Sequence, residues 1–256
     1  MRVLGALLFG GAILAISVPT VAADEQSGFT ELFKKLNNDR WYMSNGWANG
    51  DHQSCEFRAD AIQILDGSMR LTLSDRGGQV RPIGCPEIHT RARFGYGTYA
   101  ARLRTAAGSG LNTAFFTYIG PPNGVPVWDE IDFEFLGKSP KSVSIGFWAN
   151  GRVHGPSDIE LGFDASKAFH DYVFEWTPEG ICWYADGKII AKSHEGEKVP
   201  STPGMLFFSL WSGSSVEDGW MGPFRYKEPV TAEIESTSFR PTTSAACPIV
   251  NGLDSK

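Results

Sequence analysis

The sequence predicts one all-β domain, a sandwich or a barrel, on the basis of three observations. Short stretches rich in β-branched and aromatic residues recur along the 256 residues, separated by Asn, Asp and many Gly (29) and Pro (15). Helical periodicity is weak throughout the chain. Hydrophobic residues make up 42% of the sequence, which is enough to form a sizeable core in a single domain of this length.

The strand candidates follow one another without intervening helices, which is the pattern of a sandwich or barrel. At most, a turn or two of helix is expected within 29–37 or 164–169. Asp186-Gly187 is a strong two-residue hairpin signal, so the segment around it should form two paired strands. The strand candidates are 68–74, 97–105, 141–149, 171–177, 180–193 and 205–211.

The two ends of the chain differ from this body. Residues 1–23 have one basic residue, Arg2, near their start, followed by an apolar run that ends in small residues. This pattern predicts a secretory signal peptide cleaved before Asp24, with an uncleaved membrane anchor as the alternative. Residues 242–256 are small and polar, which predicts a loosely ordered tail. The folded domain should therefore span 24–241.

The charge of the chain limits its partners. The chain has 23 basic and 29 acidic residues, and removal of 1–23 takes away only Arg2, which leaves 22 against 29 and a net charge of −7. This sign, without a basic cluster, argues against a nucleic-acid partner and favours a neutral or weakly charged substrate. No other segment is long and apolar enough to cross a bilayer. We expect a secreted monomer, extracellular or periplasmic, that does not bind a membrane after cleavage.

The four cysteines, Cys55, Cys85, Cys182 and Cys247, would enter an oxidising compartment in which disulfides form. Four cysteines allow three pairings, and the sequence alone does not select one. No Cys-x-x-Cys pair is present, which argues against a zinc site. Cys182 lies in an apolar run, so a buried free thiol is the alternative to a disulfide there.

The stretch WDEIDFEFLG, residues 128–137, places four acids within six residues. Neighbouring acids repel one another, and Asp and Glu are poor strand formers, so a merely solvated strand face is a weak explanation. A calcium site is the second ordinary explanation, but calcium loops are usually flexible and rich in Asp, Asn and Gly. Strand side chains alternate between two faces. One face would carry Trp128, Glu130, Asp132, Glu134 and Leu136, and the core face would carry Asp129, Ile131, Phe133 and Phe135.

Three acids on one strand face suit glycoside hydrolysis. That chemistry usually needs two carboxyl groups of different proton affinity, one at the sugar carbon and one that protonates the leaving oxygen. A third acid between them raises the proton affinity of its neighbours or shares a proton with one of them. The Cα atoms of Glu130 and Glu134 would lie about 13 Å apart in a strand, a gap that two Glu side chains can largely close. A carboxyl separation of about 5–5.5 Å would correspond to retention of anomeric configuration.

With DEIDFEFLG at 129–137, the chain resembles glycoside hydrolase family 16, specifically the bacterial lichenase type of endo-β-1,3-1,4-glucanase. Rhizobial secreted glycanases that depolymerise succinoglycan belong to the same group. The uninterrupted E-x-D-x-E spacing differs from that of laminarinase-type relatives, which have one extra residue before the last Glu. The resemblance extends from about Phe33 to Phe239 and includes FFTYIGP (115–121) and SLWSG (209–213).

The resemblance implies that 24–241 is a catalytic domain, a jelly-roll β-sandwich of two antiparallel sheets with a concave substrate groove. Glu130 would be the nucleophile, Glu134 the general acid/base and Asp132 the helper that tunes them. The implied activity is retaining endo-hydrolysis, without a catalytic cofactor, of β-1,3-1,4-linked glucan or a related bacterial exopolysaccharide such as succinoglycan. A transglycosylase on the same substrates is one alternative. A non-catalytic carbohydrate-binding protein is another, but it would not need three acids on one strand face.

Further positions match residues that contact substrate in the family. They are Trp47, Asn49, Glu87, Phe116, Tyr118, Trp128, Trp148, Trp211 and Trp220. Aromatic faces suit the apolar faces of sugar rings, although core packing is an equally ordinary role for any single ring. Trp176 and Trp183 are assigned to the core or sheet surface. The resemblance also implies a Cys55–Cys85 disulfide, which would close a loop of about 30 residues and stabilise the fold by roughly 3–4 kcal/mol.

The sequence departs from the family pattern at several positions. His89 stands where lichenases have an arginine, and Gly146 where they have an asparagine, which reduces the implied contacts to a linear mixed-linkage glucan. The family often binds a structural calcium on the convex side, but near that place this chain has Glu235 instead of the usual aspartate. Calcium is therefore allowed, and no metal ligand is assigned. The histidines form no ligand-spaced cluster, and no Ser-His-Asp set stands out.

Overall fold

A computed structural model describes residues 27–121 and 125–242. The predicted signal peptide at 1–23, residues 243–256 of the predicted tail at 242–256, and Cys247 lie outside the described residues. Within the two described ranges, no helix has the length and apolar character needed to cross a membrane.

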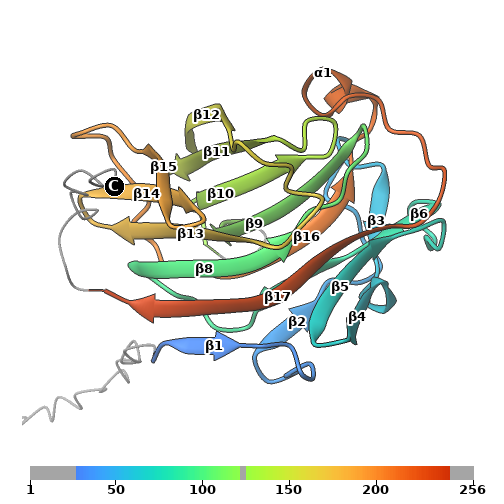
Figure 1. The fold of residues 1–256 in the computed structure, drawn as a ribbon, viewed down its shortest axis with the longest axis horizontal. Coiled ribbons are helices and arrows are strands. Elements are labelled where there is room, and N and C mark those ends of the chain that lie inside the picture. Colours follow the sequence, from blue (N-terminus) through green and yellow to red (C-terminus); the bar gives the residue numbers. More distant parts are fainter. Residues whose placement is uncertain (1–26, 122–124, 243–256) are drawn as a thin grey trace, which may run out of the picture.

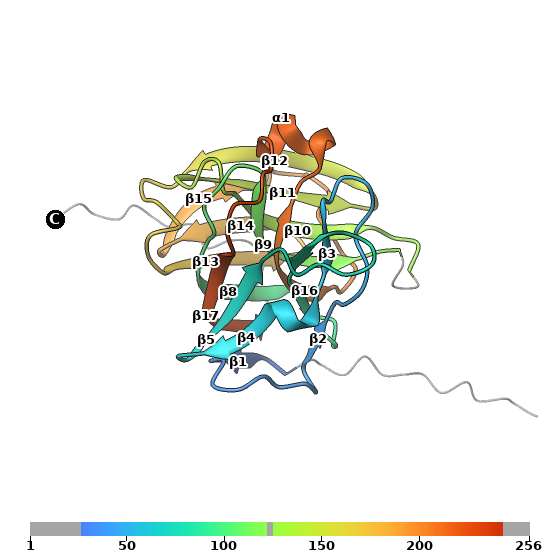
Figure 2. The same ribbon diagram turned by 90° about the vertical axis from the view of Figure 1, so that its right-hand side faces the viewer.

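The chain forms two large antiparallel sheets stacked as layers (Figures 1 and 2). The eight-stranded sheet contains β1 (Phe29–Glu31), β4 (Ile62–Leu65), β5 (Ser68–Leu73), β8 (Gly97–Arg104), β13 (His170–Thr177), β14 (Gly180–Ala185), β15 (Lys188–Lys192) and β17 (Val230–Pro241). Its order is β15-β14-β13-β8-β17-β5-β4, with β1 also paired to β17.

The seven-stranded sheet carries the acidic strand near its middle. It contains β2 (Trp41–Met43), β7 (Glu87–Thr90), β9 (Leu111–Ile119), β10 (Asp129–Leu136), β11 (Ser142–Ala149), β12 (Arg152–Glu160) and β16 (Met205–Ser212). Its order is β12-β11-β10-β9-β16-β7-β2. The predicted arrangement of two antiparallel sheets is confirmed.

A third, small sheet was not predicted from the sequence. β3 (Cys55–Phe57) and β6 (Ile83–Cys85) pair in parallel, and the predicted Cys55–Cys85 disulfide joins them with an S–S distance of 2.06 Å. Cys182 is buried and disulfide-bonded, so it is not a free thiol. The helical segments are η1 (Ala59–Ala61), η2 (Ser215–Glu217) and α1 (Asp218–Met221), and α1 lies at the rim of the molecule (top of Figures 1 and 2).

All six predicted strand segments are strands, and the hairpin is where the sequence predicts it. Asp186 and Gly187 connect β14 to β15 with φ of 47° and 73°, the left-handed conformations that this tight turn requires. The segment 29–37 does not form a helix, because Phe29 pairs with Phe239 in β17 and its ring packs against Phe94. These tertiary contacts override a weak helical pattern.

Aromatic rings fill the space between the sheets. Phe115 lies 5.9 Å from Phe133 and 5.2 Å from Phe208 within the seven-stranded sheet, measured between ring centroids. Across the core, Phe133 lies 5.7 Å from Tyr172, edge to face. Such offset and edge-to-face pairs stabilise a core beyond the area that they bury. Trp176 and Trp183, which the sequence assigned to the core or sheet surface, are buried in the core.

Candidate active site

The acidic strand β10 is fixed from its inner face and from across the core. Ile131 and Phe133 are fully buried, and Phe133 is parallel to Phe115 of β9. The indole N–H of Trp183, in the opposite sheet, donates to the backbone carbonyl of Asp132 at 3.1 Å. The pairing of β10 with β9 and β11 runs without a bulge, so its outer side chains alternate strictly.

Asp129 anchors the start of β10. The sequence places Asp129 on the apolar face, and the structure buries it there. Its Oδ1 accepts the N–H of Asn150 at 2.7 Å, and its Oδ2 accepts the N–H groups of Ser201 and Thr202, both at 3.0 Å. Three backbone donors replace the water that a carboxylate loses on burial. The interaction ties β10 to the β11–β12 turn and to the loop before β16.

The outer face of β10 carries Glu130, Asp132 and Glu134 in a row, as the alternation predicts. All three line one groove across the seven-stranded sheet, with a volume of about 1040 Å³. Leu136, on the same face, is buried and does not line the groove. The repelling acids therefore share one recess, the arrangement expected of a functional site.

The structure brings the predicted substrate-binding residues to the same groove. All nine line it: Trp47, Asn49, Glu87, Phe116, Tyr118, Trp128, Trp148, Trp211 and Trp220. They come from four strands (β7, β9, β11 and β16), from the loop before β3, from the residue that precedes β10 and from α1, so the fold assembles the groove from distant parts of the chain. Trp47 and Trp128 are 41% and 39% exposed, which leaves apolar ring surface open to a ligand.

One wall of the groove depends on the small third sheet. The side chain of Gln53 is buried, and its Oε1 accepts the backbone N–H of Asn49 at 3.0 Å. Its Nε2 lies 3.4 and 3.3 Å from the two sulfurs of the disulfide. Trp47 packs edge-on against Phe57 of β3, with ring centroids 4.8 Å apart. The disulfide therefore braces the loop that carries Trp47 and Asn49.

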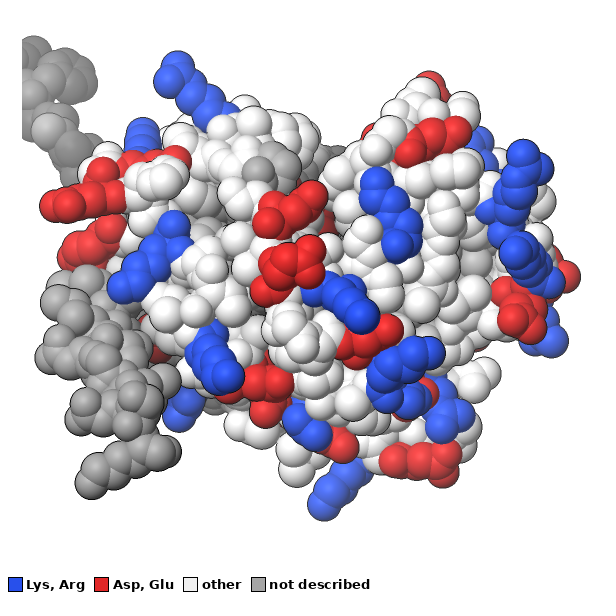
Figure 3. Space-filling view, turned by 45° about the horizontal axis from the view of Figure 1, so that its top comes forward, with Lys and Arg blue, Asp and Glu red and all other residues white. Residues whose placement is uncertain are grey.

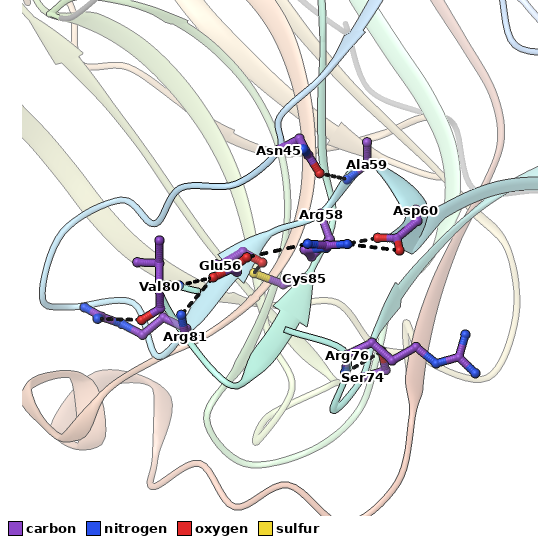
Figure 4. Close-up of polar contacts among 10 residues, drawn as sticks. All are labelled: Asn45, Glu56, Arg58, Ala59, Asp60, Ser74, Arg76, Val80, Arg81 and Cys85. Atoms are coloured by element: carbon purple, nitrogen blue, oxygen red, sulfur yellow. Dashed lines mark hydrogen bonds and ion pairs between the residues drawn. The ribbon is translucent and has the colours of Figure 1, made fainter. Parts of the chain in front are cut away.

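Glu56 braces this small sheet from behind (Figure 4). Its carboxylate accepts the backbone N–H groups of Val80 and Arg81 at 2.6 and 2.8 Å, and the Arg58 guanidinium lies 3.8 Å away. At Gly78 the loop approaches this carboxylate so closely that a Cβ would collide with it, so glycine is required there.

On the face of the molecule shown in Figure 3, basic and acidic side chains are interspersed.

Glu130 is oriented by two neighbouring tryptophans. The indole N–H of Trp128 donates to Glu130 Oε2 at 2.6 Å. The Trp128 ring stacks on Trp148 with centroids 4.3 Å apart, and Trp148 lies directly opposite Glu130 in the strand pairing. Stacking on Trp148 holds the Trp128 ring in place, and the Trp128 indole N–H in turn holds Oε2 of the Glu130 carboxyl group.

Glu134 is held by Asn112, a residue that the sequence analysis missed. The Asn112 side-chain amide donates to Glu134 Oε1 at 2.9 Å. Asn112 is fully buried, and its Oδ1 has no hydrogen-bond partner in the described part of the chain. The signal was present in the sequence, because Asn112 lies on the same strand face as Phe116 and Tyr118 at a spacing of two.

The three acids hold their protons more strongly than free carboxylic acids. Burial raises the pKa of Glu130 to about 7, against the effect of hydrogen bonds from Trp128 and Asp132. Burial, with the charge of Glu130, raises the pKa of Glu134 to about 8, and Asn112 opposes the rise. The pKa of Asp132 lies well above its usual value, because burial and both neighbouring charges disfavour ionisation. Of the two glutamates, Glu130 has the lower pKa.

Similarity to known proteins identifies the family of the chain. Glycosyl hydrolases family 16 matches residues 49–227 of the chain. The chain belongs to this family. It is 39% identical to the "Endo-1,3-1,4-beta-glycanase ExoK" of Rhizobium meliloti over 211 residues, 82% of this chain and 78% of that protein. It is 35% identical to a "Beta-glucanase" of Bacillus subtilis over 232 residues, 90% of this chain and 93% of that protein.

A solved structure extends the comparison from sequence to fold. The crystal structure of a prokaryotic beta-1,3-1,4-glucanase (lichenase) from a mouse hindgut metagenome superposes with a TM-score of 0.81 at 35% identity. The match covers 85% of this chain and 100% of that one. The resemblance to family 16 and the jelly-roll sandwich that it implies are confirmed, and the chain is a glycoside hydrolase.

Glu87 adds a further acid with a raised pKa to the family 16 groove. The hydroxyl of Ser44 donates to Glu87 Oε1 at 2.6 Å, and burial raises the pKa of Glu87 to about 7. Glu87 and Ser44 lie in the same cross-strand row as Glu134. This acid reaches the groove two strands beyond β9, where it can meet a sugar away from the reacting bond.

The residues around Glu235 give no support to the calcium that the family resemblance allows. Arg102 Nε donates to Glu235 Oε2 at 2.6 Å, so this carboxylate already has a cationic partner from the protein. Within residues 27–121 and 125–242, no group of three or more His, Cys, Asp or Glu could hold a metal ion. We assign no step to a metal.

Proposed function

We propose that this protein is a secreted endo-acting hydrolase of a β-1,3-1,4-linked glucan or a related bacterial exopolysaccharide, and that it retains anomeric configuration. The observation that carries the proposal is the row of Glu130, Asp132 and Glu134 at the floor of an aromatic-lined groove. The names of the similar proteins support the same substrate class. A groove of about 1040 Å³ lined by several rings suits binding within a long chain.

In the first step, Glu130 attacks the anomeric carbon of the sugar. Its ionised oxygen forms the new bond while Glu134, still protonated, gives its proton to the leaving glycosidic oxygen. The pKa order supports this division, because Glu130 loses its proton at about 7 and Glu134 only at about 8. In the second step, Glu134 takes a proton from water, and that water displaces Glu130 from the sugar.

Asp132 acts as the helper between the two glutamates. Burial and the charges of both glutamates raise its pKa and so favour its protonated form, which can donate a hydrogen bond to ionised Glu130 without adding a third negative charge. The donated bond stabilises the Glu130 carboxylate in the free enzyme and its departure from the sugar in the second step.

The pH dependence of kcat/KM should be bell-shaped. Activity should rise as the pH increases through about 7, where Glu130 ionises, and fall as it passes about 8, where Glu134 loses its proton. The two limbs belong to the coupled pair rather than to isolated groups. Initial rates on a soluble neutral glucan across this range test the prediction. Glu87→Gln, which removes a groove acid that has a raised pKa but lies off β10, should keep both limbs. An acid limb below about pH 5, the range of an ordinary Glu, would contradict the assignment.

The function itself is tested with a set of polymers. Reducing-sugar release should be highest on mixed-linkage glucan or an exopolysaccharide, and proton NMR of the first product should show the β-anomer. An α-anomer as the first product would exclude retention. Adding an oligosaccharide acceptor distinguishes a transglycosylase, which would form longer products. Binding of these polymers without any cleavage would indicate a carbohydrate-binding protein instead.

A further inference from the structure

A row of rings crosses the groove floor from the acids to the edge of the sheet. In the strand register Asp132 pairs with Phe116, Phe116 with Phe207, Phe207 with His89, and His89 with Tyr42. The successive ring centroids lie 4.8, 4.6 and 5.0 Å apart. The row covers four strand spacings, about 19 Å, so several sugar units can lie along it.

Arg91 lies where this row ends. Its guanidinium sits over the Tyr42 ring at 5.4 Å, and its Nε donates to the backbone carbonyl of Asn38 at 2.9 Å. The side chain is exposed, and its two terminal nitrogens have no partner among the described residues. Nearby Arg40 differs, because its guanidinium is bonded to Glu31 at 2.9 Å. Arg91 is thus held in position by two contacts that leave its outer edge free.

The charge at this end of the groove is unlike the charge elsewhere in it. Arg91 is the one Lys or Arg among the described residues that line the groove. The acidic lining residues are Glu87, Glu130, Asp132, Glu134 and Glu217. His89 adds no charge near neutral pH, because burial lowers its pKa. The guanidinium lies about 19 Å along the row from Asp132, well beyond the screening length of about 8 Å at physiological salt.

We infer that the Tyr42–Arg91 end of the groove binds a carboxylate carried on a sugar unit of the polysaccharide. This inference rests on the proposed function and specifies its substrate class further. Arginine presents a planar fork that binds a carboxylate through two parallel hydrogen bonds. The stack on Tyr42 and the bond to Asn38 pre-orient that fork, so little freedom is lost on binding. A carboxylate nearer β10 would meet the acids, whereas at Arg91 it meets a guanidinium whose terminal nitrogens are free to bind it.

The experiment compares three derivatives of one mixed-linkage glucan at equal, low substitution. The first carries neutral hydroxyethyl groups, the second carboxymethyl groups, and the third has some C6 hydroxymethyl groups oxidised to carboxyl groups. Arg91→Gln should lower kcat/KM on one or both acidic polymers about three- to tenfold and change it less than twofold on the neutral polymer. Arg91→Lys keeps the positive charge but not the planar fork, so its kcat/KM on the acidic polymers should lie between the values of wild type and Arg91→Gln. Lys188→Gln, an exposed change on β15, is the matched control and should leave all three rates unchanged.

The outcomes separate this site from the proposed function. If Arg91→Gln lowers kcat/KM on the carboxymethyl polymer alone, the site binds an acid appended to the sugar. If it lowers kcat/KM on the oxidised polymer alone, the site binds a uronate. Equal effects of Arg91→Gln on acidic and neutral polymers, or no effect, would overturn the Arg91 site and leave glucan hydrolysis standing. Failure of the wild-type protein to cleave any of the three would overturn both. Unchanged activity on the neutral polymer also shows that the variant folds.

Discussion

Replacing Glu130 by Gln should reduce kcat on glucan by at least about 10⁴-fold, because the amide cannot form the covalent bond to the sugar. The fold should persist. Gln keeps the size of the side chain, and its Oε1 can still accept the Trp128 indole N–H that now reaches Glu130 at 2.6 Å. Removing one of three repelling acids should leave the melting temperature equal or higher. Steady-state rates check the loss of kcat. Calorimetric binding of an oligosaccharide checks that the fold and the groove persist, and thermal unfolding gives the melting temperature.

Glu217→Gln is the matched control for loss of a groove carboxylate. Glu217 also lines the groove and its charge adds to the rise in the pKa of Glu134, but it lies on η2 and not on β10. We expect this variant to lose less than about tenfold in kcat, with the alkaline limb moved slightly to lower pH. Residual activity of Glu130→Gln above about one per cent of wild type would refute the nucleophile assignment.

Replacing Glu134 by Ala should produce a loss that depends on the leaving group. On glucan, whose leaving oxygen needs a proton, kcat should fall by about 10³- to 10⁴-fold. On an aryl β-glycoside with an acidic phenol, bond breaking needs no proton, so the first step should be much less affected. The second step should then limit turnover, because no base activates the water.

Azide distinguishes the two glutamates by the product that it forms. In Glu134→Ala, azide needs no base and should displace Glu130 from the sugar, which gives a β-glycosyl azide and restores turnover. In Glu130→Ala, azide should occupy the space of the nucleophile and give the α-glycosyl azide. NMR of the products reads the anomer directly. The reverse pattern of anomers would mean that the two roles are exchanged.

The sequence predicted the acidic row because that row depends on a local rule. Alternation along 128–137 places Glu130, Asp132 and Glu134 on one face whatever the rest of the chain does, provided that the strand has no bulge. The buried face of the strand is predictable from the same short stretch, because Ile131 and Phe133 are apolar and pack in the core. The hairpin at Asp186-Gly187 is likewise predictable from two adjacent residues.

Other parts of the site depend on contacts that no single segment contains. Asn112 meets Glu134 only because β9 and β10 are paired in a particular register. Asp129 lies on the apolar face, as predicted, but its three backbone partners come from turns 21 to 73 residues away. The parallel β3–β6 pair brings Cys85 within 3.3 Å of the Gln53 side chain, a contact between residues 32 positions apart in the chain.

The most direct test of the central claim is to trap the sugar on the enzyme. A 2-deoxy-2-fluoro β-oligoglucoside with a dinitrophenyl leaving group should react quickly in the first step and slowly in the second, so the glycosyl-enzyme accumulates. After proteolysis, mass spectrometry should find one added fluoro-oligosaccharide on the peptide that contains Glu130, with fragment ions placing it on that residue. The label should be absent from Glu130→Gln. Attachment to Asp132 or Glu134, or turnover with no covalent species and an α-anomer as the first product, would contradict the account.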